Sequence, residues 1–179
     1  MQYFFISDEH FGHVNILKFC KRPFGTIQEM DDALIANYNS VVKPEDVVIH
    51  VGDFTLAPKE IAKRYIARLT GKHVFIRGSH DRWMENDYTY LREFKINGQG
   101  IVACHYAMRV WPKSHYGTWQ VFAHSHGRLK PEGKQWDVGV DNNNFFPVSF
   151  DQLIEIMKGL PDNFNLVRNR VKDNLGDES

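Results

Sequence analysis

The chain has 179 residues, which suits one domain with one sizeable core. Hydrophobic residues make up 42% of it and aromatic residues 13%, so a packed fold is expected and global disorder is excluded. Lys+Arg and Asp+Glu both number 22, so the chain lacks the overall basic charge typical of nucleic-acid-binding proteins, although a local basic rim remains open.

The cysteines are too few for a disulfide framework, because only Cys20 and Cys104 occur and neither has a Cys-x-x-Cys partner. No apolar run approaches the ~20 residues of a membrane-spanning helix. The start, "MQYFFISDEHFGH", lacks the basic segment of a signal peptide. We therefore expect a cytoplasmic protein without a membrane partner. The unusual residue is histidine, which occurs nine times, often in tight clusters.

Strands and helices alternate in the first half of the predicted fold. Short apolar runs that end at polar turns are typical of buried strands, and apolar side chains at helical spacing indicate amphipathic helices. Thr26 followed by Glu29 has the form of a capping box, and Gly71 is placed as a C-cap. The predicted elements of this half are strands at 2–7, 46–53 and 73–78 and helices at 26–42 and 57–71.

Strands dominate the second half. Residues 93–105 have the pattern of a hairpin, with two β-type runs joined by a glycine-bearing turn. A later amphipathic helix has Ser149 as its candidate N-cap. The remaining predicted elements are strands at 118–127 and 136–141, that helix at 148–160 and a frayed polar tail at 174–179.

This order of elements favours an α/β layered fold with one mixed sheet or two stacked sheets. On such folds, chemistry takes place beyond the carboxyl ends of the strands. Polar residues follow the predicted strands at these places: Asp8, His10, Asp53, Ser79, His80, Asp81, His105, His124 and His126.

Imidazoles and carboxylates of this kind are the usual protein ligands of Zn, Mn and Fe. Asp8-x-His10 and His124-x-His126 are i, i+2 pairs, whose members can converge on one point at the end of a strand. Asp53 follows a glycine, which lets the backbone turn sharply. The candidates exceed the needs of one ion, but two ions ~3.5–4 Å apart that share a carboxylate would use most of them.

Each of these residues also has an ordinary explanation. A histidine at the end of a strand is most often a hydrogen-bonded surface group, and an aspartate there is most often a turn former. His-x-His alone is a weak signal. The metal hypothesis depends on five separate segments that carry ligand-type residues, all at predicted strand ends.

The order of the motifs resembles the signature of the calcineurin-like metallophosphoesterases. That signature reads Asp-x-His, Gly-Asp, Gly-Asn-His-Asp/Glu, His and Gly-His-x-His. The segments "SDEHFGHVNI", "KRPF", "VVKPEDVV" and "VGVDNNNFFPVS" also look like a small bacterial and phage branch of that superfamily, and the resemblance extends over about residues 2 to 155. The matching motifs are "DEH" (8–10), "GD" (52–53), "GSHD" (78–81), "CH" (104–105) and "HSHG" (124–127).

The resemblance implies a four-layer α-β-β-α sandwich of two mixed sheets flanked by helices, formed as one domain by residues 1–179. It implies that His80 sits over the reaction centre without binding metal, and that Asp81 orients His80 or a neighbouring loop. The implied ligands are Asp8, His10 and His126 for the first metal, Asp53 for both, and His105, His124 and Ser79 for the second.

Ser79 departs from the family pattern, which has asparagine at this position. A serine hydroxyl is shorter than an asparagine side chain and is a weaker ligand than an amide carbonyl. We therefore expect a second metal to bind more loosely here, or a water to fill the gap. Glu9, between two implied ligands, is also uncommon; we expect it to face solvent or to tune the site.

The implied function is that of a metal-dependent phosphoric ester hydrolase with two divalent ions, drawn from Mn, Fe, Zn, Co and Ni. Two cations lower the pKa of a bridging water, and the resulting hydroxide attacks phosphorus in line with the leaving oxygen. His80, as imidazolium, would protonate the leaving alkoxide. The substrate would be a phosphodiester or phosphomonoester, with nucleotides and nucleic-acid ends among the candidates. The sequence indicates no oligomeric state.

Basic and aromatic residues near the motifs could extend the site. A cation there could hold a second phosphate, and an aromatic ring could stack a base, although surface charge and core packing are the commoner roles. His13 could support a ligand, whereas we assign structural roles to His50, His73 and His115. The cations are Arg77, Arg82, Arg109, Lys113 and Arg128, and the rings belong to Trp83, Trp111 and Phe145.

Two other functions compete with this hypothesis. The first is a scaffold that has this fold and weakened catalysis, like the phosphoesterase-like subunit of retromer; such proteins lose several ligands, whereas only position 79 departs here. The second is a metallo-β-lactamase-type hydrolase, in which an Asp-His pair follows His-x-His. Gly127 and Arg128 occupy those positions, which disfavours this alternative.

Overall fold

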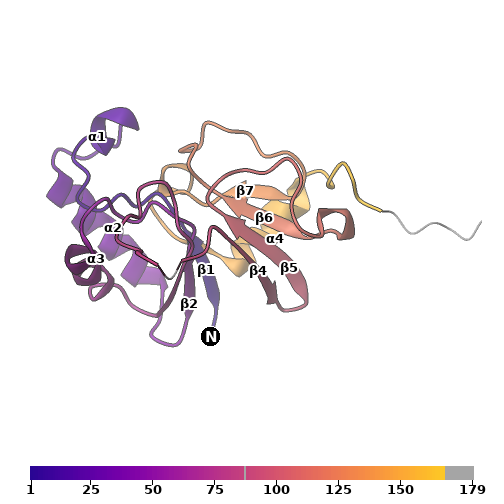
Figure 1. Cartoon of the computed structure of the whole chain (residues 1–179), viewed down its shortest axis with the longest axis horizontal. Coiled ribbons are helices and arrows are strands. Elements are labelled where there is room, and N and C mark those ends of the chain that lie inside the picture. Colours follow the sequence, from indigo (N-terminus) through magenta and orange to yellow (C-terminus); the bar gives the residue numbers. More distant parts are fainter. Residues whose placement is uncertain (87, 168–179) are drawn as a thin grey trace, which may run out of the picture.

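Two mixed sheets of four strands form the centre of the computed structural model, which describes residues 1–86 and 88–167 (Figure 1). The first has the order β3-β2-β1-β8, with β8 antiparallel to β1 and the others parallel. The second has the order β4-β5-β6-β7, with only β4 antiparallel. The strands are β1 (Tyr3–Ile6), β2 (Val47–His50), β3 (Lys72–Phe75), β4 (Leu91–Ile96), β5 (Gln99–Cys104), β6 (Trp119–Phe122), β7 (Gln135–Asp137) and β8 (Val148–Ser149).

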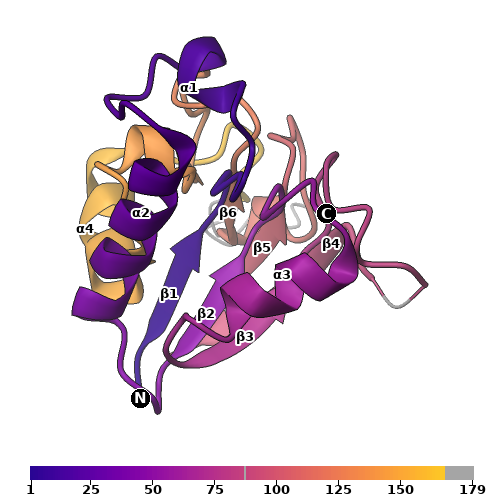
Figure 2. The ribbon, with the colours of Figure 1, turned by 90° about the vertical axis from the view of Figure 1, so that its left-hand side faces the viewer.

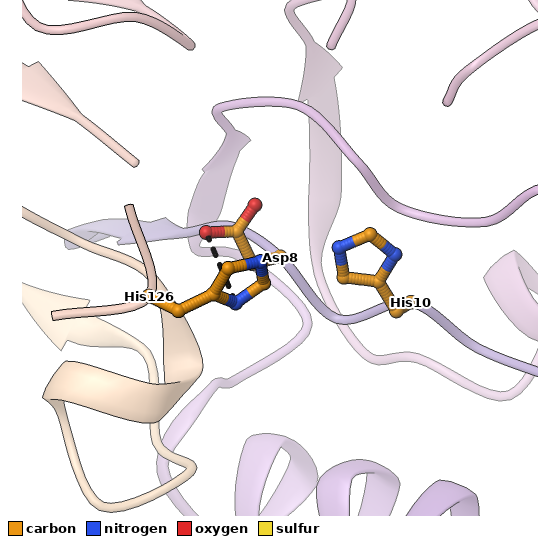
Figure 3. A group of neighbouring side chains, drawn as sticks. All are labelled: Asp8, His10 and His126. Carbon is orange, nitrogen blue, oxygen red and sulfur yellow. Dashed lines mark ion pairs between the residues drawn. The ribbon is translucent and has the colours of Figure 1, made fainter. Parts of the chain in front are cut away.

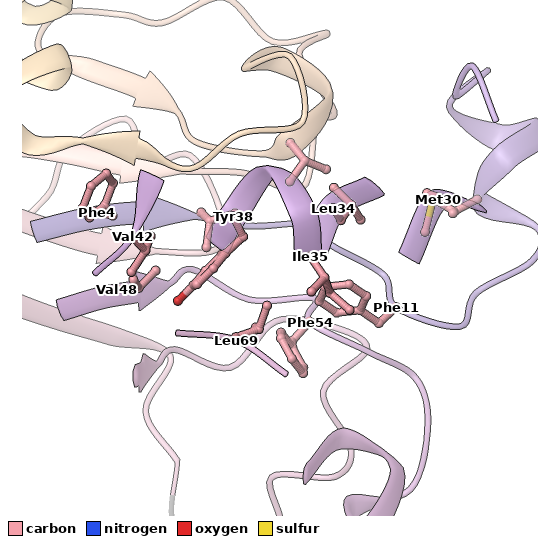
Figure 4. Close-up of a cluster of buried hydrophobic side chains, with 13 residues drawn as sticks. Phe4, Phe11, Met30, Leu34, Ile35, Tyr38, Val42, Val48, Phe54 and Leu69 are labelled. Carbon is pink, nitrogen blue, oxygen red and sulfur yellow. The ribbon is translucent and has the colours of Figure 1, made fainter. Parts of the chain in front are cut away.

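Helices α2 (Ile27–Val41) and α3 (Lys59–Ile66) cover the outer face of the first sheet, as Figure 2 shows. Their core includes Leu34 and Tyr38 of α2, which pack with Val48 and Phe54 (Figure 4). A second cluster lies between the sheets and takes in side chains of β1, β2, β5 and β6. Helix α4 (Phe150–Gly159) packs against β1, β7 and β8 and completes this cluster. The expected pair of mixed sheets flanked by helices is confirmed.

Local sequence signals explain where several elements begin. The Ser149 side chain accepts a hydrogen bond from the Gln152 N–H, and the Gln152 side chain accepts one from the Ser149 N–H, which is a complete capping box. The Thr26 hydroxyl likewise accepts the Glu29 N–H, but the Glu29 carboxylate accepts from Gly25 instead. The predicted α2 capping box is therefore only half formed.

The predicted hairpin forms from β4 and β5, whose residues pair up to Ile96 and Gln99. Asn97 and Gly98 make the two-residue turn, and both have positive φ, as this tight hairpin type requires. The register places Ile101 and Ala103 in the core between the sheets. This hairpin therefore sets the position of His105, which follows β5 directly.

Some predicted boundaries are wrong. Helix α3 ends at Ile66, because the next residues form tighter i to i+3 bonds, and Gly71 lies in the later turn rather than capping the helix. The first two residues of the predicted 148–160 helix form β8 instead, paired with β1. The four-residue helix α1 (Ile16–Phe19) was not predicted, because it is too short to show helical periodicity. The expected frayed tail at 174–179 lies outside the described residues.

The fold places the carboxyl ends of β1, β2 and β3 beside those of β5, β6 and β7, and the sequence motifs follow these ends. In the described part of the chain, no helix has the length and apolar character required to cross a bilayer.

Candidate metal centre

Three predicted ligands from two separate loops form the first half of the candidate centre. Asp8 and His10 follow β1, and His126 follows β6. One ligand atom from each lies within 4.8 Å of the other two (Figure 3). The His126 Nδ1 atom lies 3.9 Å from Asp8 Oδ2. This group matches the residues expected to hold the first metal.

The second half is formed by Asp53, His105 and His124, whose ligand atoms also lie within 4.8 Å of one another. The carboxylate of Asp53 joins the two halves. Its Oδ2 atom lies 3.2 Å from His105 Nε2, 3.8 Å from His10 Nε2 and 3.9 Å from His80 Nε2. Asp53 therefore occupies the position that a shared, bridging ligand would need.

The side-chain atoms in this centre fit bound cations. Asp8 Oδ1, His10 Nε2 and His105 Nε2 are buried, and none has a hydrogen-bond partner among the described residues. Buried polar atoms without partners are costly, and such groups are rare unless a ligand, water or ion satisfies them. His105 Nδ1 lies 2.9 Å from the Val51 carbonyl, which can accept its proton and leave Nε2 free to bind a metal. The donor set is that of a divalent transition-metal site.

The backbone at the centre is strained. Asp8, His10, Asp53, His124 and His126 all have positive φ, between 50° and 67°. This left-handed region is uncommon for residues other than glycine and costs of order 1 kcal/mol or more for each one. Strain of this kind persists only where the surrounding structure enforces it, and it gathers at functional sites.

Two glycines allow the loops to approach closely. A Cβ added to Gly52 would lie 2.8 Å from the Gly78 backbone nitrogen and 2.6 Å from His105 Nδ1. One added to Gly78 would clash with the backbone nitrogen and carboxylate of Asp53. The loops after β2 and β3 therefore meet only because both positions lack side chains, and this contact brings "GD" and "GSHD" together.

Asp81 holds these loops rather than His80. Its buried carboxylate accepts hydrogen bonds from the N–H groups of Asp53 at 2.7 Å, Phe54 at 2.9 Å and Gly78 at 2.9 Å. It also accepts the indole N–H of Trp83 at 3.0 Å. Of the two roles expected for Asp81, this geometry favours the orientation of a neighbouring loop.

Ser79 lies beside Asp53 at the exposed edge of the centre. Its hydroxyl donates to Asp53 Oδ2 at 3.0 Å, and the following N–H, from His80, donates to Asp53 Oδ1 at 2.8 Å. The segment therefore holds the shared carboxylate through two bonds. Position 79 therefore borders the second half of the centre, but its hydroxyl bonds to the Asp53 carboxylate.

Arg22 and Asp141 support the centre; both lie in segments that resemble the family, "KRPF" and "VGVDNNNFFPVS", but no role could be assigned to either residue from the sequence. Arg22 is buried and makes two bonds to the Asp141 carboxylate, at 2.7 and 2.8 Å. Its guanidinium also donates to the carbonyls of Asp8 and Glu9. Asp141 in turn lies 2.7 Å from His126 Nδ1 and can orient that ring. Arg22 and Asp141 lie 119 residues apart, so no spacing pattern could have linked these two residues.

Glu9 does not face solvent, contrary to one of the two expectations for it. It is buried, and its Oε1 atom lies 2.6 Å from His50 Nδ1. The Nε2 atom of His50 lies 3.1 Å from His73 Nδ1, so these three side chains form a polar chain behind the centre. The structural roles predicted for His50 and His73 agree with this arrangement.

Comparison with known proteins identifies the family. Residues 1–172 match the family described as calcineurin-like phosphoesterase. The chain belongs to this family. The uncharacterized protein MJ1445 of Methanocaldococcus jannaschii is 33% identical over 164 residues, which cover 87% of this chain and 90% of that protein. Among solved structures, the protein of unknown function AQ665 from Aquifex aeolicus has a TM-score of 0.66 and 23% identity, over 87% of this chain and 98% of that one. The latter similarity bears on the fold alone.

Two groups in the candidate centre, Asp8 and His105, have pKa values raised into the neutral range. Burial raises the pKa of Asp8 to about 7, against the opposing charges of His105 and His126. Burial lowers the pKa of His105, but the negative charge of the Asp53 carboxylate, whose Oδ2 atom lies 3.2 Å from His105 Nε2, outweighs it and raises that pKa to about 8. In the metal-free protein at neutral pH, His105 is therefore mostly protonated and Asp8 about half protonated.

Metal binding should consequently release protons and strengthen as the pH rises from below 7 to above 8. The sign follows because carboxylate and imidazole bind metal only when deprotonated, and both pKa values are raised. Calorimetric titration with Mn²⁺ in two buffers of different ionisation enthalpy would count the protons. The His105→Ala variant should release fewer. An affinity that is independent of pH over this range would contradict the expectation.

Proposed function

We propose that the chain is a dinuclear metal-dependent phosphoesterase with His80 as its general acid. The observation that carries the proposal is the pair of ligand groups joined by the Asp53 carboxylate. Family membership supports a phosphate-ester substrate. The unpartnered buried atoms of Asp8, His10 and His105 support occupancy by cations.

Two bound divalent ions would supply Lewis acidity and would lower the pKa of a coordinated water toward neutrality. The chain's own contribution is to hold the donors. The Val51 carbonyl orients His105, and Asp141 orients His126. His13 Nδ1 lies 3.4 Å from His10 Nδ1, and both residues line a cavity that opens over the centre, which supports the expectation that His13 could support a ligand.

His80 is suited to proton transfer because its ring remains accessible. The side chain is 41% exposed, whereas those of His10 and His105 are at most 2% exposed. Its backbone N–H is bonded to Asp53, which fixes the position of the residue while the ring lines the cavity. Its ring centroid lies 5.2 Å from that of His10. An imidazole so placed can deliver a proton to a leaving oxygen at the centre.

The test is a comparison of metal-stripped and reconstituted protein. Mn, Fe, Zn, Co and Ni would be added back separately, and each sample would receive an aryl phosphodiester and the matching monoester. We expect about two ions for each chain and metal-dependent hydrolysis of at least one ester. Binding of metal without hydrolysis of either ester would favour the scaffold alternative, and absence of metal binding would reject both parts of the proposal.

Ser79→Asn should tighten the weaker of the two metals by about tenfold, by analogy with other changes around metal ligands. The longer asparagine carbonyl could reach the Asp53, His105 and His124 group, where the present hydroxyl bonds to Asp53 instead. Activity at limiting metal should rise in parallel. A metal titration of activity for both proteins checks this, with the remote exposed variant Ser40→Asn as control. Superimposable curves would mean that position 79 is not a ligand position.

A further inference from the structure

A cavity of about 480 Å³ opens over the candidate centre, and its lining combines two kinds of chemistry. Part of the lining consists of ligand-type groups, among them Asp53, His80, His124 and His126. Helix α1 and its C-cap contribute the apolar residues Ile16, Phe19 and Cys20, and Arg128, whose charge acts on Cys20, adds a cation to this α1 side. A phosphate ester at the centre would therefore place the rest of its structure against the α1 side.

Phe19 is the most exposed part of that apolar side. It is the last residue of α1, and its side chain is 69% exposed although it lines a cavity. Its ring meets the His13 ring edge to face at 6.3 Å, and His13 lies 6.0 Å from His80. An exposed aromatic ring beside a catalytic cavity offers a face on which a flat group can stack.

The aromatic residues singled out from the sequence do not offer such a face. Trp111 is buried, with only 4% of its surface exposed. Trp83 packs against Phe54 and Phe75 and donates its indole N–H to Asp81. Phe145 packs against Phe24. All three belong to the packing of the fold, and none of them lines the cavity.

Arg128 is the cation that reaches the cavity. Its Nε donates to the Ser125 carbonyl at 3.0 Å, which anchors the guanidinium, and no carboxylate of the described residues pairs with it. Two other cations considered from the sequence are occupied elsewhere, since Arg109 pairs with Glu132 and Lys113 with Glu93. An anchored guanidinium with free N–H groups is a good partner for phosphate.

We propose that the α1 side of the cavity is a nucleotide subsite, in which the base stacks on Phe19 and a second phosphate binds Arg128. The substrate class is thus a nucleotide ester that carries a phosphate beyond the one attacked. This inference rests on the proposed function, because that function places the reacting phosphate at the centre.

Three nitrophenyl phosphodiesters with the same leaving group test the subsite. The first carries an ethyl group, the second thymidine, and the third thymidine with a further phosphate on its free sugar hydroxyl. Because the leaving group is constant, ratios of kcat/KM between these esters report the contribution of the added nucleoside or of the added phosphate. We expect each addition to raise kcat/KM in the reconstituted protein.

Phe19→Ala should lower the ratio of the thymidine ester to the ethyl ester by roughly 5- to 100-fold, the range typical of one base–aromatic stack. Arg128→Gln should lower the ratio of the bisphosphate ester to the thymidine ester by roughly tenfold or more. The matched controls are Phe164→Ala, an exposed ring outside the cavity, and Arg64→Gln, an exposed cation on α3. Neither control should change these ratios.

A competing platform exists on the surface at Tyr88 and Tyr90, which are exposed and carry Arg77 over the Tyr88 ring at 4.0 Å. If Tyr90→Ala lowers the ratio of kcat/KM between the thymidine and ethyl esters and Phe19→Ala does not, the subsite is misplaced and the proposal is overturned. Unchanged ratios in both Phe19→Ala and Arg128→Gln overturn it as well.

Binding of thymidine bisphosphate, measured by calorimetry with and without Mn²⁺, provides a readout that does not need turnover. Its Kd should rise in Phe19→Ala and Arg128→Gln and stay unchanged in the two controls. If no ester is hydrolysed but this pattern of binding appears, the proposed function fails and the subsite stands. If the esters are hydrolysed but binding is insensitive to both substitutions, the function stands and the subsite fails.

Discussion

Replacing His80 with alanine should lower kcat for an alkyl phosphodiester by about 10²–10⁴-fold, the contribution typical of a general acid. The loss should be much smaller for a nitrophenyl ester, because nitrophenolate leaves without protonation. The metal content should stay the same, since neither the group of Asp8, His10 and His126 nor that of Asp53, His105 and His124 includes His80. The backbone bond from residue 80 to Asp53 also survives this substitution.

The measurement is single-turnover hydrolysis across a series of leaving groups, together with elemental analysis of each protein. His115→Ala, which removes a ring tilted against that of Tyr116 outside the cavity, is the control for loss of an imidazole. An equal loss for good and poor leaving groups would assign His80 to phosphate binding. Loss of metal would instead assign it as a ligand, because His80 can also form a group with His10 and Asp53.

Replacing Asp81 with alanine should reduce the free energy of unfolding by about 3–6 kcal/mol. The estimate follows because the buried N–H groups of Asp53, Phe54 and Gly78 would each lose a charged acceptor. The same change should weaken metal binding, since these bonds fix the loop that carries Asp53. The loss of stability arises from buried N–H groups left without an acceptor, so it should also be present in the metal-free protein.

Chemical denaturation of the metal-free protein measures this effect. Asp32→Asn, which breaks an exposed ion pair with Arg68, is a suitable control and should leave stability almost unchanged. If Asp81 acts by orienting His80 instead, Asp81→Ala will unfold at the same denaturant concentration as the unaltered chain. In that case the pH dependence of kcat, rather than stability, will change.

The sequence predicted the parts of the fold and site that depend on local patterns. Buried strands followed by polar residues located Asp8, Asp53 and His105, because a strand end and a ligand-type side chain are adjacent in the chain. The Asn97–Gly98 turn and the Ser149 cap were likewise readable from neighbouring residues. The division of the candidate ligands into two groups came from the resemblance of the motif order to the family signature, because no local pattern contains that division.

Features that depend on contacts between distant segments could not be predicted. Asp141, in a short 3-10 helix after β7, supports His126, and Arg22 reaches Asp141 from a different part of the chain. Phe19 looks like any apolar residue until the cavity beside it is known. Glu9 was expected to face solvent or to tune the site. Its contact with His50 could not be foreseen, because nothing near Glu9 in the sequence indicates it.

The left-handed backbone at Asp8, His10, Asp53, His124 and His126 has a consequence for how this family member can evolve. Glycine would relax the backbone at each of these positions, but it would also delete the donor. Selection for a durable fold and selection for the metal centre therefore pull in opposite directions at the same residues. Glycine at any one of these five positions should therefore stabilise the fold and remove one candidate ligand.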